Sequence, residues 1–119
     1  MKTILLIEDT QTEAILIKDA LSKAGFNIVH AGSSEEAKTK LGGVIPDLIL
    51  TDVVLPGESG FEFCRALKEA PETANIPVVI CSTKDSEMDK FWGMKQGAAA
   101  YLTKPIQEDE LVRTIQLHA

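Results

Sequence analysis

The chain has 119 residues, with 12 Lys and Arg against 18 Asp and Glu, a net charge of −6 and 45% hydrophobic residues. This balance is typical of one soluble domain, expected to span residues 1–119, and it leaves no room for a second domain. A chain of this length buries roughly two-thirds of its extended surface, so it can form a core without metal or disulfide support.

The longest apolar runs, such as residues 4–7, are far shorter than the ~18 residues of a membrane span. No signal peptide is readable at the N-terminus, so we expect a cytoplasmic protein without membrane insertion. The acidic balance, without a cluster of Lys and Arg, argues against nucleic-acid binding. Cys64 and Cys81 are too few and too far apart for a disulfide framework and are expected to be buried thiols.

Short runs rich in β-branched residues alternate with helical stretches along the whole chain. The runs have the length of strands and are bounded by turn or helix signals, which predicts strands at 3–7, 27–31, 47–51, 78–81 and 99–102. Between them, Thr10 with Glu13 and Ser33 with Glu36 form capping-box patterns that begin two helices. Glycines end these helices, at residue 25 and at residues 42–43. Further helices are predicted over about 60–70, over about 86–96, and from about 107 onward.

Five such strand–helix units with short connections predict an α/β fold. Successive parallel strands need right-handed crossovers, so the helices must cover both faces of a doubly wound, five-stranded parallel sheet. The runs 4–7, 48–50 and 78–80 are apolar throughout, as buried parallel strands are. In such a sheet the ligand crevice lies at the carboxyl ends of the strands, where the strand order reverses.

Polar residues follow the predicted strands at that edge. Glu8 and Asp9 follow the first strand, Asp52 the third, Ser82 the fourth and Lys104 the fifth. Three acids brought together repel one another unless a hard cation or the lysine offsets their charge, and Mg²⁺ suits this set of oxygen ligands. An acidic metal pocket with an opposing lysine is arranged to receive a phosphoryl group, with Asp52 as the carboxylate nucleophile.

Several motifs together resemble the CheY-like receiver domain of bacterial response regulators, over essentially the whole chain. They are Ile7-Glu8-Asp9, the run 47–52 with Leu55-Pro56-Gly57 and Gly60, Ser82-Thr83, and the run 101–105. The resemblance implies the flavodoxin-like strand order 2-1-3-4-5. The segments 81–84 and 89–97 are further similar to the PilH-like single-domain receivers of type IV pilus motility and phototaxis.

The resemblance also implies a role for each matching residue. Asp52 would be the phosphoacceptor, and Mg²⁺ would be held by Glu8, Asp9, Asp52 and the backbone carbonyl of Val54. Lys104 and Ser82 would contact the phosphoryl group. Ser82 and Tyr101 would act as a switch that remodels the face formed by the fourth helix, fifth strand and fifth helix.

On this reading the protein is a signalling protein rather than an enzyme, with only Mg²⁺-dependent self-phosphorylation and self-dephosphorylation. Its partners would be a histidine kinase or phosphotransfer protein and a downstream protein target. Two variants of the reading stay open: a phosphate sink that drains a shared kinase, and a receiver fragment of a larger regulator. A flavin-binding or nucleotide-binding module is disfavoured because Glu8 and Asp9 stand where a phosphate cradle needs glycines. A phosphatase of the haloacid type needs a cap and a longer chain.

Each candidate also has a structural explanation. Glu8 and Asp9 could form a solvated turn, Asp52 could cap a turn, and Tyr101 could simply pack at the sheet edge. Two residues depart from the family pattern: Val54 has no polar group to orient water, and Thr83 is bulkier than the Ala or Gly frequent there. A cis Lys104-Pro105 bond is predicted. Phe91 is expected in the core, and Trp92 and Met94 either in the core or exposed as partner anchors.

Overall fold

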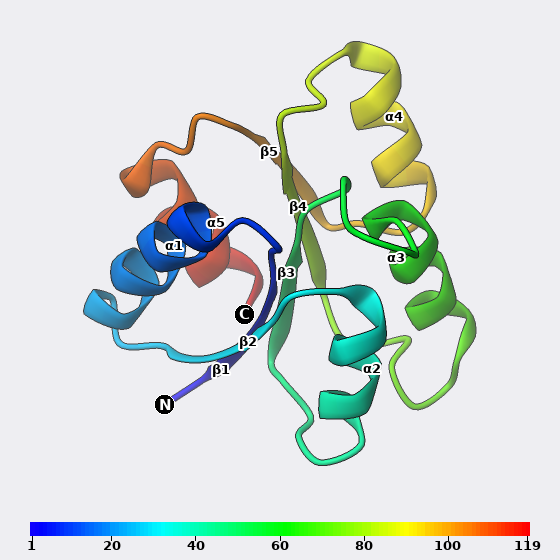
Figure 1. The fold of residues 1–119 in the computed structure, drawn as a ribbon, viewed down its shortest axis with the longest axis horizontal. Helices are drawn as coiled ribbons and strands as arrows, with labels where there is room; N and C mark the ends of the chain where they lie inside the picture. The colour runs from blue at the N-terminus through cyan, green and yellow to red at the C-terminus, as the bar shows by residue number, and fades with distance from the viewer.

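The computed structural model describes residues 1–119 as a three-layer α/β sandwich (Figure 1). Its strands are β1 (Thr3–Ile7), β2 (Asn27–Ala31), β3 (Leu48–Thr51), β4 (Val78–Ser82) and β5 (Ala100–Thr103). Its helices are α1 (Gln11–Lys23), α2 (Ser34–Leu41), α3 (Gly60–Glu69), α4 (Glu87–Lys95) and α5 (Glu108–His118). No helix is both long and apolar enough to cross a bilayer.

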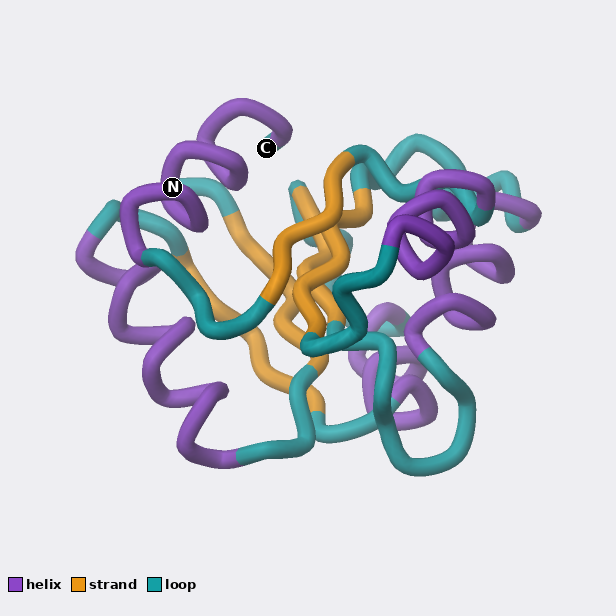
Figure 2. The backbone as a smooth tube through the Cα atoms, turned by 90° about the horizontal axis from the view of Figure 1, so that it is seen from above, coloured by secondary structure: helices purple, strands orange, loops and turns teal.

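All neighbouring strands of the sheet are parallel and run in the order β2-β1-β3-β4-β5. The strands lie together in the middle of the molecule with helices on either side (Figure 2). The predicted doubly wound α/β fold and its strand order are therefore confirmed. The order reverses between β1 and β3, which pair in register from Ile4 with Leu48 to Ile7 with Thr51. The residues that follow these two strands consequently lie next to each other at the carboxyl edge.

The helices divide between the two faces of the sheet, with α1 and α5 on one side and α2, α3 and α4 on the other (Figure 1). Alternate residues of β1 face opposite sides of the sheet. Ile4 and Leu6 pack with α1 and α5, whereas Leu5 and Ile7 pack with α2 and α3. Because each face has its own apolar layer, β1, β3 and β4 are apolar on both sides. Cys64 and Cys81 are free and buried, as predicted.

Element boundaries agree with the predictions to within one or two residues, with one consequence for the site. Ser82 is the last residue of β4 rather than the residue after it, and it is fully buried. The structure also shows capping boxes at Ser59 with Glu62 and at Ser86 with Asp89, and neither pair was recognised in the sequence.

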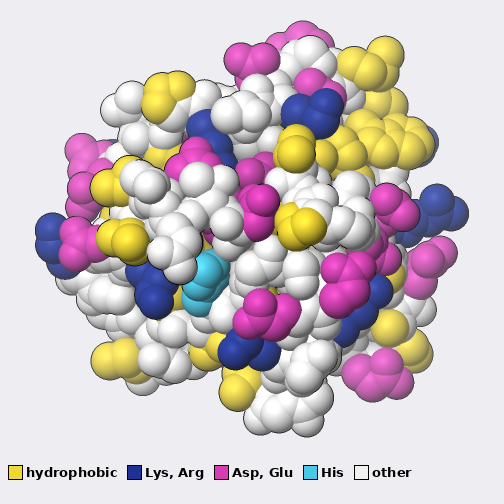
Figure 3. Space-filling view, in the orientation of Figure 1, with side chains coloured by type: hydrophobic (Ala, Val, Ile, Leu, Met, Phe, Trp, Pro, Cys, Tyr) yellow, Lys and Arg dark blue, Asp and Glu magenta, His cyan; other side chains and the backbone are white.

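The prediction that Phe91 lies in the core is wrong, because its side chain is 60% exposed. The buried position of α4 is Gly93, which faces the Tyr101 ring and Ile80. Two residues of helix rotate the side-chain direction by about 200°, so Phe91 points away from that contact. Trp92 and Met94 are also exposed, and hydrophobic side chains gather over α4 in the space-filling view (Figure 3).

Candidate functional site

The centre of the carboxyl edge is the Lys104 ammonium, which three carboxylates surround. Its Nζ donates hydrogen bonds to Glu8 Oε1 at 2.7 Å, to Asp52 Oδ2 at 2.8 Å and to Glu13 Oε2 at 3.0 Å. The lysine side chain is 4% exposed and Glu8 is 2% exposed, so these ion pairs lie largely out of water. The predicted convergence of Glu8, Asp52 and Lys104 is therefore what the structure shows.

Parallel-strand geometry accounts for the meeting of these distant residues. Glu8 and Asp52 directly follow the paired ends of β1 and β3, and Lys104 directly follows β5. The Lys104 amide donates to the Ser82 carbonyl at 2.9 Å, which ties the end of β5 to the end of β4. The Lys104-Pro105 peptide bond is cis, as predicted.

The third carboxylate, Glu13, was missed as a site residue. The sequence pattern assigned it to a capping box with Thr10, but Thr10 makes no side-chain capping bond to α1. Glu13 lies in the first turn of α1, six residues after the end of β1, and its carboxylate reaches back to Lys104. A carboxylate four or five residues after a strand-end acid is the signal that could have identified it.

Asp9, in contrast, is exposed and lies outside the group of carboxylates, which consists of Glu8, Glu13 and Asp52. Its neighbour Glu8 points inward, where Glu8 Oε2 also accepts a hydrogen bond from the Thr10 amide at 3.2 Å. Sequence reasoning treated the two acids as equivalent, but adjacent residues at a strand end point to different sides.

The two oxygens of Asp52 have different partners. Oδ1 accepts hydrogen bonds from the amides of Val53 at 2.6 Å and Val54 at 3.3 Å, while Oδ2 accepts from Lys104. Two backbone amides and one ammonium therefore fix the orientation of this carboxylate. The Val54 side chain is 56% exposed and offers no polar group beside Asp52.

Burial and charge act in opposite directions on these groups. Burial raises the pKa of Glu8, and the hydrogen bond and charge of Lys104 offset that effect only in part. For Lys104, burial acts to lower the pKa, but the hydrogen bonds to Asp52, Glu8 and Glu13 outweigh it, so that its pKa is raised. The lysine is therefore held firmly in its charged form.

Ser82 and Tyr101 lie beside this cluster rather than within it. The Ser82 hydroxyl oxygen accepts a hydrogen bond from the Lys84 amide at 3.2 Å, and the Tyr101 hydroxyl donates to the Lys84 carbonyl at 2.6 Å. Both residues thus contact the loop between β4 and α4. Burial, followed by the charge of Asp89, raises the pKa of the Tyr101 phenol to about 12.

The donor set fits a hard divalent cation. The potential ligand oxygens of Glu8, Glu13 and Asp52 lie within 4.8 Å of one another, and no His or Cys belongs to the group. Three carboxylates against one ammonium leave two negative charges without a counter-charge, which equals the charge of one divalent ion. Oxygen ligands and this charge suit Mg²⁺ or Mn²⁺ better than zinc.

Comparison with known proteins agrees with this geometry. Residues 4–116 match the family model described as the response regulator receiver domain. Protein PilH of Pseudomonas aeruginosa is 41% identical over 97% of this chain and 95% of its own length. The phosphate regulon transcriptional regulatory protein PhoB of the same bacterium is 37% identical over 97% of this chain, which spans 50% of that protein.

Solved structures show the same fold. The chemotaxis response regulator CheY4 of Vibrio cholerae has a TM-score of 0.92 at 28% identity, covering 100% of this chain and 99% of its own. The Mn²⁺-bound form of response regulator Rcp1 has a TM-score of 0.84 at 27% identity, covering 98% of this chain and 90% of its own. Receiver domains bind a divalent cation in an acidic pocket, act in two-component signalling, and interact with histidine kinases and downstream targets. The chain belongs to the receiver domain family of response regulators.

Proposed function

We propose that residues 1–119 act as one receiver domain in which Asp52 accepts a phosphoryl group from a histidine kinase or a phosphotransfer protein. The observation that carries the proposal is the asymmetric setting of the Asp52 carboxylate. Backbone amides hold one oxygen, and Lys104 holds the other at the carboxyl edge of the sheet. A carboxylate fixed in this way is oriented for attack, with a cation next to the oxygen that reacts.

In the proposed step, an Asp52 oxygen attacks the phosphorus of a phosphohistidine. An oxygen–phosphorus bond forms as the phosphorus–nitrogen bond breaks, and the departing imidazole nitrogen takes up a proton from water. Lys104 stabilises negative charge on the phosphoryl oxygens, and the hydroxyl of Ser82, buried at the end of β4, is the proposed second hydrogen-bond donor to them.

Mg²⁺ is the proposed cofactor of this site. Glu8, Asp9, Asp52 and the backbone carbonyl of Val54 are the proposed ligands, with Glu13 close by in the same carboxylate group. When bound, the ion would neutralise charge on the phosphoryl oxygens. Asp9 is exposed, so it is free to bind the ion directly or through water.

The proposed output surface is the face formed by α4, β5 and α5. Tyr101 of β5 links this face to the site, since its ring lies against Gly93 of α4 and its hydroxyl bonds to the loop before α4. Movement of Ser82 toward a phosphoryl group would alter this loop and so bias α4. The exposed Met88, Phe91 and Met94 of α4 offer apolar area for a downstream protein.

The similarity to PilH supports a role in pilus motility, with phototaxis as the related alternative, in the cytoplasm. A phosphate sink would use the same Asp52 chemistry and differ only in lacking an output partner.

The test is phosphoryl incorporation. The protein should gain the mass of one phosphoryl group when incubated with Mg²⁺ and acetyl phosphate, and Asp52→Asn should gain none. Asp47→Asn, which removes an acid at the opposite end of β3, is the matched control and should react like the parent. If the parent remains unmodified both by acetyl phosphate and by a phosphorylated histidine kinase, the proposed function is wrong.

A further inference from the structure

We propose that Glu13 is a positioning residue that holds Lys104 in the unphosphorylated protein and gives up this contact when a phosphoryl group arrives. The inference rests on the proposed function, in which the phosphoryl group binds at Asp52 beside Lys104. It concerns a residue of α1 that the sequence pattern placed only in a capping box and in none of the site motifs.

Lys104 has no spare hydrogen-bond donor in the unphosphorylated protein. A lysine ammonium has three N–H groups and no acceptor. Lys104 donates to Glu8, Glu13 and Asp52, so all of its donors are in use. When the Asp52 oxygen that Lys104 holds bonds to phosphorus, one donor passes to a phosphoryl oxygen. A second phosphoryl oxygen can then accept from Lys104 only by replacing Glu8 or Glu13.

Glu13 is the partner that is easiest to replace. Its contact with Lys104 is the longest of the three, at 3.0 Å, and its side chain is 33% exposed, against 2% for Glu8 and 10% for Asp52. Glu8 is also held by the Thr10 amide, and Asp52 carries the phosphoryl group itself. Release of Glu13 costs the least because water can solvate its carboxylate as soon as it leaves.

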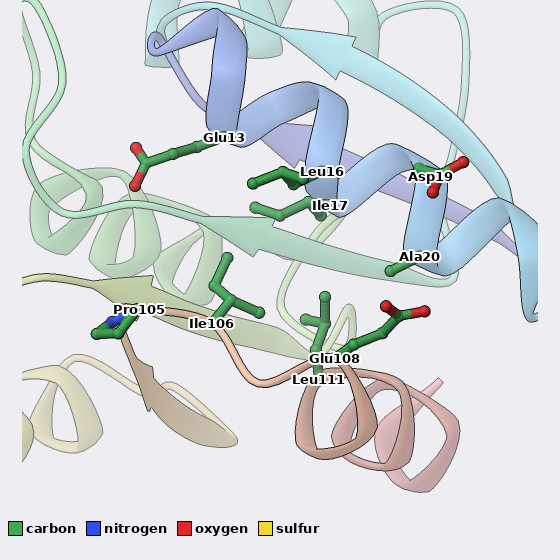
Figure 4. Close-up of a pocket in the computed structure, with 9 residues that line it drawn as sticks. All are labelled: Glu13, Leu16, Ile17, Asp19, Ala20, Pro105, Ile106, Glu108 and Leu111. Carbon is green, nitrogen blue, oxygen red and sulfur yellow. The ribbon is translucent and has the colours of Figure 1, made fainter.

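There is space for the released side chain. Glu13 lies at one end of a groove of about 270 Å³ between α1 and α5, which Leu16, Ile17, Ile106 and Leu111 also line (Figure 4). In that view the Glu13 carboxylate points away from the apolar part of the groove. Because the Glu13 side chain is 33% exposed, its carboxylate can rotate toward solvent without displacing the core.

A contact made only in the unphosphorylated state stabilises that state alone. Removing it should lower the stability of the free protein and tighten the binding of a phosphoryl analogue by the same free energy. The stability of the analogue-bound protein should then be unchanged. A purely structural residue would lower the stability of both states equally and leave the affinity as it was.

The experiment compares the parent, Glu13→Gln and Asp19→Asn. Asp19 is an exposed acid of the same helix that pairs with Lys23, so its variant matches the change in charge. Beryllofluoride serves as the phosphoryl analogue. Urea unfolding, followed by circular dichroism, gives the free energy of unfolding of each protein with and without Mg²⁺ and beryllofluoride. Calorimetric titration with beryllofluoride in Mg²⁺ gives the affinity.

The dissociation constant of Glu13→Gln for beryllofluoride should be about fivefold lower than that of the parent. Without beryllofluoride, the unfolding equilibrium constant of the variant should be higher by the same factor. With beryllofluoride bound, the two proteins should be equally stable. Asp19→Asn should bind like the parent. The inference is overturned if Glu13→Gln loses equal stability in both states, or if its affinity rises while its free-state stability is unchanged, which would indicate a general charge effect. A parent that does not bind beryllofluoride would overturn the proposed function, and the inference with it.

Discussion

Gly60, the first residue of α3, lies against the backbone carbonyl of Asp52. A Cβ atom at residue 60 would be 1.9 Å from the Asp52 oxygen and 3.0 Å from the Val53 Cα atom. The Gly60 amide also donates to the Val53 carbonyl at 2.9 Å. The start of α3 is therefore packed directly on the peptide that carries the proposed phosphoacceptor, and only a residue without a side chain allows this approach.

Gly60→Ala should destabilise the protein by about 3 kcal/mol, because the clash is with backbone that cannot rotate away. The preference of helices for Ala over Gly, worth about 1 kcal/mol, is too small to compensate. Urea unfolding of the variant measures the loss. Gly43→Ala is the control, since the nearest atom to its new Cβ would be 3.9 Å away. A variant at residue 60 as stable as the parent would contradict the close packing.

Tyr101 is the only tyrosine of the chain, so its titration can be followed by ultraviolet absorbance without interference from another phenol. Burial and the charge of Asp89 raise its pKa from 10.0 to about 12. The neutral phenol is the form that the folded state favours, so its contribution to stability is complete below pH 10.0 and is lost as the pH rises through about 12.

We therefore expect an absorbance midpoint near pH 12 in the folded protein, with circular dichroism recorded in parallel. Asp89→Asn should shift the midpoint downward by removing one of the charges that oppose ionisation. A midpoint near 10.0 with an intact dichroism spectrum would show that the phenol is solvated rather than packed under α4.

The central part of the site could be predicted from the sequence because topology alone brings it together. Parallel strands that alternate with helices must place their carboxyl ends at one edge, so Glu8, Asp52 and Lys104 could be associated despite their separation in the chain. The central strands β1, β3 and β4 could also be predicted, because strands covered by helices on both faces are apolar throughout.

Side-chain direction was harder to predict. Thr10 with Glu13 fits the capping-box pattern, but the same spacing also lets Glu13 reach Lys104, and the charge of the lysine decides between them. Phe91 was misplaced because α4 is buried through Gly93, a residue that carries no hydrophobic signal. Both errors come from tertiary contacts that a local pattern does not contain.

The raised pKa of Glu8 predicts how the metal-free protein responds to pH. Desolvation by burial is the largest cause, and it favours the protonated acid in the folded state. Because the pKa of Glu8 is higher in the folded than in the unfolded protein, its contribution to stability is complete when the pH is below 4.5, the pKa of the unfolded state. The contribution declines as the pH rises through the higher pKa of the folded state.

The measurement is the unfolding free energy of the parent minus that of Glu8→Gln, recorded with a chelator present at several pH values. This difference should fall as the pH rises above 4.5, because glutamine mimics the neutral acid at every pH. A difference that increases with pH would mean that attraction to Lys104 outweighs the cost of burial.

Three residues of α2 contact Glu58, which lies near the far end of the loop that follows Asp52. The Ser34 hydroxyl donates to the Glu58 carbonyl at 3.1 Å, a Glu35 carboxylate oxygen accepts from the Glu58 amide at 3.3 Å, and the Lys38 ammonium lies 3.0 Å from the Glu58 carboxylate. Ser34 is fully buried, so its hydrogen bond is the one that water cannot replace.

Ser34→Ala should therefore destabilise the protein by about 1 kcal/mol, since it leaves the Glu58 carbonyl without this donor. Amide hydrogen exchange should accelerate at Glu58 more than in the central strands, because the loop loses an anchor while the sheet does not. Ser22→Ala, at an exposed position of α1, should stay within about 0.5 kcal/mol of the parent. Unchanged exchange at Glu58 in the Ser34 variant would show that Glu35 and Lys38 are sufficient to hold the loop that carries the proposed Mg²⁺ ligand Val54.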